Sequence, residues 1–181
     1  MIRTINSILG FVSILLFCIH AITMSLFLAG YLTYSHTRIY WGYALLVCVI
    51  LHGILSLFLI TFGDGKKKQI SYLKQNAGSY LQRILGIFMI VLIYFHMSAY
   101  GSTNEEGIYV LKEPDKMTFV TQALLALVAG AHITLSFPKS AITLGMISSE
   151  AEYQNYKNLS YMIFFIVIGM SLYSMWKYFF G

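Results

Sequence analysis

Five long apolar runs, separated by short polar segments, constrain this chain more than any other feature of its sequence. They cover residues 8–30, 39–62, 79–101, 117–146 and 159–181. Each run is near the roughly 20 residues that a helix needs to cross a bilayer. Only 10% of the residues are charged, against about 25% in a typical soluble domain. We therefore expect an all-α integral membrane bundle of five transmembrane helices that forms a single domain over the whole chain.

The details of these runs refine that expectation. The first run is too long for a removable signal peptide, so we take it as a retained helix. The fourth run exceeds one perpendicular span, and we expect Pro138 to kink it or to end its buried part. Cys18 and Cys48 lie inside apolar runs without metal-binding spacing, and we interpret them as small core residues.

The basic residues predict which way the helices run. Lysine and arginine accumulate in cytoplasmic loops, and the connection after the second run is the most basic segment. Its basic residues are Lys66, Lys67, Lys68, Lys74 and Arg83. We therefore place this connection and the N-terminus in the cytoplasm and the C-terminus on the outer side. Alternation then assigns Arg3, Lys139 and Lys157 to the cytoplasmic side and Arg38, Lys112, Lys116 and Lys177 to the outer side. No basic patch with interleaved aromatic residues is present, so we expect lipid and no nucleic acid as a partner.

The acidic residues exclude several classes of function. All of them fall outside the predicted spans, at Asp64, Glu105, Glu106, Glu113, Asp115, Glu150 and Glu152. An ion-coupled transporter usually needs a carboxylate at membrane depth, and a hydrolase needs a nucleophile with a base and an acid. Neither pattern is visible in the sequence.

Histidine is the chemically active residue that remains inside the runs. His20, His52, His96 and His132 lie one in each of the first four runs, and His36 lies in a short outer loop. Neutral imidazoles that face a bundle interior suit bis-histidine haem ligation, in which two helices supply one ligand each. Two such pairs predict two haem groups. Packing and a proton relay stay open as alternatives.

The depth of each histidine suggests the pairing. His96 follows Arg83 by 13 residues, which places it roughly 20 Å from the cytoplasmic end of its helix. His132 precedes Lys139 by seven residues, roughly 10 Å from the same side. We therefore pair His20 with His96 near the outer face and the other two histidines nearer the cytoplasm.

Three glycines share one spacing to these histidines. Gly10, Gly42 and Gly86 each precede a histidine by ten residues, about 15 Å along a helix. A missing side chain at that distance would let the macrocycle of the other haem approach the helix. Small residues that help helices to pack are an equally good interpretation.

The chain resembles a known family in these features. The pattern is similar to the membrane anchor of succinate dehydrogenase and quinol:fumarate reductase, in its single-chain, five-helix, dihaem cytochrome b form. In that family four histidines from four helices ligate two haem b groups. His20, His52, His96 and His132 match these ligands in order, and the resemblance covers nearly the whole chain.

Two short motifs add to the resemblance. "SYLQRILG" resembles the Ser-x-x-His-Arg-x-x-Gly start of an anchor helix, where serine and arginine serve quinone. Ser79, Arg83 and Gly86 fit this motif, whereas Gln82 replaces the histidine.

The second motif, "HITLSFPKSAITLG", resembles the family's haem-ligand helix, His-x3-Gly-x-Arg-His-x5-Gly. His132 and Gly145 fit, Ser136 replaces a glycine, and Pro138 with Lys139 replaces Arg-His. Lys139 can still pair with a haem propionate.

The resemblance implies an electron-transfer role in the bacterial inner membrane. The chain would dock onto an iron–sulfur subunit that contacts a flavoprotein, where succinate and fumarate interconvert, so it would not itself catalyse dicarboxylate chemistry. Electrons would pass through the haems to quinone, usually menaquinone in dihaem members. The family's outer quinone site uses an acidic residue within a helix, which this sequence lacks. His36, Gln122, Glu105 and Glu106 are possible substitutes.

Two other classes stay open. Other cytochromes b, such as a hydrogenase anchor or a b561-type reductase, tend to place two histidines on one helix, and no run here carries two. A haem-free assembly factor or small transporter would use the histidines for packing, and it would be colourless.

Overall fold

The fold is a bundle of long helices with one short β-hairpin. A computed structural model of the chain describes residues 1–33, 35–62, 73–106, 109–113 and 115–181. In chain order the elements are α1 (Ile2–Leu28), α2 (His36–Phe62), α3 (Leu73–His96), β1 (Gly101–Thr103), β2 (Tyr109–Leu111), α4 (Lys116–Thr143), α5 (Glu150–Ile163), the π-helix η1 (Phe164–Ile168) and α6 (Gly169–Phe180). β1 and β2 pair antiparallel.

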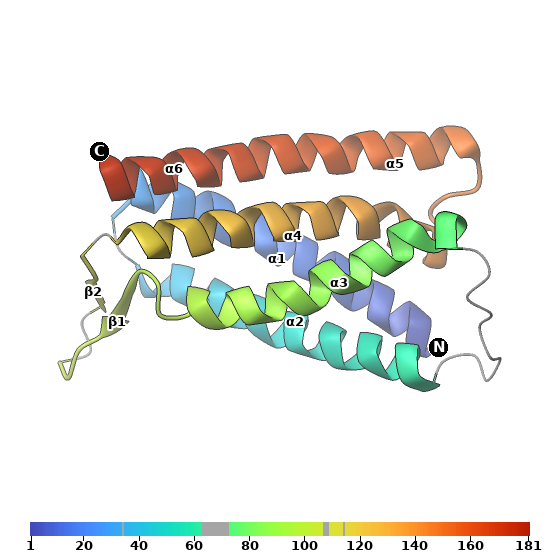
Figure 1. The fold of residues 1–181 in the computed structure, drawn as a ribbon, viewed down its shortest axis with the longest axis horizontal. Helices are drawn as coiled ribbons and strands as arrows, with labels where there is room; N and C mark the ends of the chain where they lie inside the picture. Colours follow the sequence, from blue (N-terminus) through green and yellow to red (C-terminus); the bar gives the residue numbers. More distant parts are fainter. Residues whose placement is uncertain (34, 63–72, 107–108, 114) are drawn as a thin grey trace.

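The five predicted spans are confirmed as helices. α1, α2, most of α3, α4 and the continuous helix α5–η1–α6 are each long and apolar enough to cross a membrane. Successive helices run antiparallel along the bundle, and the two chain termini lie at opposite ends (Figure 1). Such an arrangement is that of a multi-pass membrane protein.

Several predicted boundaries differ from the structure. His36, expected in a loop, is the first residue of α2, and the third helix ends at His96 rather than at residue 101. The prediction that Pro138 ends the buried part of its helix is wrong, because α4 continues through it to Thr143 and Ala141 is fully buried. Packing of α4 against its neighbours outweighs the one hydrogen bond that a proline removes.

The closest approach between two helices at a glycine lies along the last helix. α4 packs against α5, η1 and α6, and α1 packs against α6. At Gly130 an added Cβ would lie 2.5 Å from the ring of Phe164 and 2.8 Å from Ile168. The two backbones approach this closely only because residue 130 has no side chain. By contrast, α2 has no buried residue.

Side-chain caps begin the last two long helices. Asp115 accepts a hydrogen bond from the backbone of Thr118 at the start of α4, and this bond lowers the pKa of the carboxyl group. Ser149 and Glu152 form a capping box at the start of α5. Glu150 and Glu152 were expected in a connection, and they instead lie in the first turn of this helix. Acidic side chains there interact favourably with the positive end of the helix dipole.

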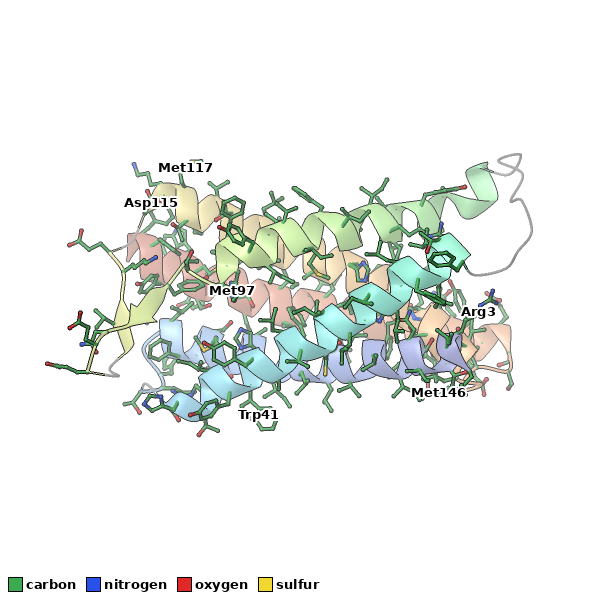
Figure 2. The ribbon with its side chains drawn as sticks, turned by 90° about the horizontal axis from the view of Figure 1, so that it is seen from below. Arg3, Trp41, Met97, Asp115, Met117 and Met146 are labelled. Atoms are coloured by element: carbon green, nitrogen blue, oxygen red, sulfur yellow. The ribbon has the colours of Figure 1, made fainter. Side chains whose placement is uncertain are left out.

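The basic residues divide between the two ends of the bundle. Arg3 and Met146 lie at one end, and Asp115 and Met117 lie at the other (Figure 2). The lysine run 66–68, the densest group of predicted cytoplasmic charges, lies outside the described residues.

Candidate cofactor-binding site

A cavity of about 600 Å³ runs through the bundle. It lies between two helix pairs that each pack closely, α1 with α2 and α3 with α4. All four predicted ligands line it, namely His20, His52, His96 and His132. The sequence predicted that these residues face one interior, and the structure brings them into one cavity.

His20 and His96 approach each other closely across the two helix pairs. Their ring centroids are 6.0 Å apart, and the ring planes lie at 82° to each other. Metal–imidazole bonds are about 2 Å long, so two imidazoles on opposite sides of one metal, with their ring radii added, have centroids roughly 6 Å apart. The spacing of this pair therefore fits a bis-histidine iron site.

Two of the histidines are held by main-chain carbonyls of the neighbouring helix. His52 Nδ1 lies 3.1 Å from the carbonyl oxygen of Asn6, and His132 Nδ1 lies 3.0 Å from that of Gln82. A carbonyl oxygen can only accept, so Nδ1 must carry the proton in each ring. In a neutral imidazole this leaves Nε2 with a lone pair, which is the form that binds a metal.

The pair of His20 and His96 is held differently. His96 Nδ1 lies 2.6 Å from the side-chain oxygen Oε1 of Gln122, whose side chain is only 2% exposed. His20 Nδ1 is buried and has no hydrogen-bond partner among the described residues. The two pairs therefore differ in how the protein supports the rings.

The three glycines of the ten-residue spacing face imidazole rings. An added Cβ would lie 3.4 Å from His52 at Gly10, 3.1 Å from His20 at Gly42 and 3.3 Å from His132 at Gly86. The sequence offered two interpretations, approach of a macrocycle or helix packing. The structure shows a third, in which a missing side chain makes room for the imidazole of the partner helix.

This facing arrangement is reciprocal within each helix pair. Gly10 of α1 faces the histidine of α2, and Gly42 of α2 faces the histidine of α1. In antiparallel helices, stepping forward on one helix means stepping back on the other, so a reciprocal pair of contacts forces equal spacings on both. The ten-residue spacing is therefore a consequence of helix register.

The second helix pair repeats the pattern with one exception. Gly86 of α3 faces His132, whereas the position ten residues before His132 is Gln122, which binds His96. Sequence analysis missed this role for Gln122. The same ten-residue spacing was the signal that could have revealed it.

The other predicted site residues gather at the end of the cavity nearest Asn6. Lys139 donates hydrogen bonds to Gln82 Oε1 at 3.0 Å and to Ser79 Oγ at 3.3 Å. Arg83 lines the cavity with Lys139, and its guanidinium also lies 5.9 Å from the ring centre of Tyr80. Among the described residues no acidic side chain lines the cavity. Two cations without a carboxylate suit an anionic group such as a propionate.

The suggested substitutes for an outer acidic residue do not gather. Glu105 and Glu106 are exposed between β1 and β2, and His36 begins α2. Gln122 alone lines the cavity, and its oxygen is bound to His96. Within the described residues no three His, Cys, Asp or Glu side chains form a metal cluster, but a haem iron needs only two protein ligands.

No protein-family model, curated protein or solved structure matches this chain.

Proposed function

We propose that the chain is a membrane-embedded, dihaem cytochrome b that transfers electrons. The observation that carries the proposal is the hydrogen bonding of the histidines in one cavity. His52 and His132 donate through Nδ1 to main-chain carbonyls, and His96 has the same arrangement with an amide oxygen. Metal-ligating histidines almost always have such a partner.

The residues of the chain would hold and orient the cofactors. His20 with His96, and His52 with His132, would each hold the iron of one haem through their imidazole nitrogens. When bound, haem b supplies one-electron transfer. The glycines at 10, 42 and 86 keep room for the rings, and the apolar helices around the cavity exclude water.

The basic end of the cavity supports the same proposal. Lys139 and Arg83 would bind propionates of the nearer haem, and Ser79 would hold the lysine or a quinone at that end. The positive-inside rule places this end in the cytoplasm, with the N-terminus there and the C-terminus outside. A bacterial inner membrane is the expected location.

The partners follow from the family resemblance. The chain would dock an iron–sulfur subunit and, through it, a flavoprotein of a succinate:quinone oxidoreductase, and it would exchange electrons with a quinone such as menaquinone. The catalysis of dicarboxylate oxidation or reduction would belong to the partner subunits.

The test is the amount of haem b per chain in detergent-purified protein, measured by pyridine haemochrome against protein mass. We expect two haems per chain with low-spin spectra. One haem would contradict the pairing of all four histidines. A colourless protein after expression with adequate haem would overturn the proposal and favour a haem-free membrane protein with packing histidines.

A further inference from the structure

The fourth position of the ten-residue spacing stands apart from the other three. Positions 10, 42 and 86 are glycine, whereas position 122 carries one of the most deeply buried side chains of the chain, at 2% exposure. A buried amide costs free energy unless its polar atoms are paired. What Gln122 binds therefore indicates why the pattern is broken there.

A chain of hydrogen bonds fixes the orientation of this amide. Gln122 Nε2 donates to Thr121 Oγ1 at 3.3 Å, and Thr121 Oγ1 donates to the Thr118 carbonyl at 2.9 Å. Because the amide nitrogen is used in this way, Oε1 is the atom that meets His96. It accepts from Nδ1–H at 2.6 Å.

The same chain explains why a side chain is needed at this position. Asn6 and Gln82 stand four residues before Gly10 and Gly86, and their carbonyls hold histidines. Thr118 stands four residues before Gln122, but its carbonyl accepts from the Thr121 hydroxyl instead. In α4 the side chain of Gln122 therefore takes the role that the main chain has in α1 and α3.

The two kinds of acceptor differ in strength. A carbonyl inside a helix already accepts the amide N–H four residues further along, so its oxygen is shared. The oxygen of Gln122 is at a shorter distance, 2.6 Å against 3.0 and 3.1 Å. A stronger acceptor at Nδ1 raises the basicity of the ligand and favours the oxidised metal.

We propose that Gln122 is a positioning residue that acts through His96 to lower the reduction potential of the haem held by His20 and His96. The inference rests on the proposed dihaem function. The two haem sites would then differ in the groups that accept hydrogen bonds from the histidines: two main-chain carbonyls at the His52/His132 site, and one side-chain amide at the His20/His96 site. The difference would help to set the direction in which electrons pass along the chain.

The test is the substitution Gln122→Leu in two single-haem backgrounds, read by spectropotentiometric titration. In a His132→Leu protein, which keeps the His20/His96 haem, we expect the midpoint potential to rise by about 59 mV. For one electron this corresponds to a tenfold change in the reduction equilibrium constant. In a His96→Leu protein, which keeps the other haem, we expect no change. The control Gln154→Leu removes an exposed glutamine of α5 and should change neither potential.

A second variant and a second readout keep the test decisive if Gln122→Leu binds haem poorly. Gln122→Gly restores the glycine pattern, and we expect it to retain the haem with a raised potential and an altered low-spin electron paramagnetic resonance signal, because the His96 ring is no longer held. Selective loss of the His20/His96 haem in both variants would also support the proposal. Unchanged potentials and spectra, or equal changes at both haems, would overturn it. A wild-type protein without two haems would instead overturn the proposed function.

Discussion

Glycine serves opposite purposes in two regions of this molecule. Along the cavity, Gly10, Gly42 and Gly86 each leave room for an imidazole ring, at 3.1 to 3.4 Å from where a Cβ would lie. Between α4 and the last helix, Gly130 leaves room for another helix, at 2.5 Å from Phe164. The comparison shows that the same residue type can build either a site or an interface, and that its neighbour decides which.

The largest expected effect concerns the cavity, the first of these two regions, and it is a loss of haem. His132→Leu removes a proposed haem ligand, so we expect haem content to fall from two to one per chain. We expect the same result for each of the other three histidines. The double variant His20→Leu/His132→Leu removes one ligand from each pair and should bind no haem. Loss of both haems from a single substitution, or no loss from any, would contradict the pairing; pyridine haemochrome analysis measures the content.

The next effect tests the helix interface. Gly130→Ala places a methyl group against Phe164 and Ile168, and such overpacking costs about 1–3 kcal/mol. We expect a lower thermal unfolding midpoint in detergent. The haem content before heating should equal that of the unsubstituted protein. Gly169→Ala is the control, since an added Cβ there meets nothing within 4 Å; an equal loss in both variants would argue against the close approach.

A smaller effect tests the cavity side. Gly42→Ala places a methyl group 3.1 Å from Cε1 and 3.2 Å from Nδ1 of His20, so the ring must shift. We expect haem affinity at the His20/His96 pair to fall by about 10–100-fold, as for other changes around a metal ligand, measured by haem titration of the apoprotein. Gly169→Ala, in α6 and outside the cavity lining, meets nothing within 4 Å and should bind haem normally; equal affinities in the two variants would refute the role of Gly42.

The smallest effect concerns the basic end of the cavity. Lys139→Met removes a cation that, in the proposed function, would stabilise the reduced haem relative to the oxidised one, so we expect the potential of the His52/His132 haem to fall. At an effective dielectric constant of about 20, a unit charge about 15 Å away contributes roughly 1 kcal/mol. Potentiometric titration measures the shift. Lys116→Met, at the opposite end of α4 and exposed, should leave this potential unchanged, and a rise in the Lys139 variant would contradict the assignment.

Much of the fold was predictable because a bilayer demands long apolar helices. The five runs became five helices, although the last one begins at Glu150, well before the predicted start at residue 159. The expectation that Pro138 could end the buried part of its helix was wrong, because local propensity weighed more in it than the burial of neighbouring residues on α4. The start of α5 was also missed, because its first turns are polar and depend on the capping box of Ser149 and Glu152.

The features of the candidate site also divide into those that the sequence predicted and those that it did not. The placing of the four histidines in one interior was expected from residue type and depth. The contact of Lys139 with Ser79 was not predicted, because the two residues were singled out separately from two different motifs. The acceptors of His52 and His132 were not, because they are main-chain carbonyls, which every residue has and no motif marks. Gln122 was considered only as a substitute for an acidic residue, and its contact with His96 depends on helix register.

For this chain, the amino-acid sequence alone determined the number of apolar helices and the placing of one histidine in each of the first four, since both depend on residue type and order. The tertiary structure decided which group faces each imidazole. That outcome depends on how two antiparallel helices align in space, and a shift of one residue in their register would bring different carbonyls and side chains to the rings.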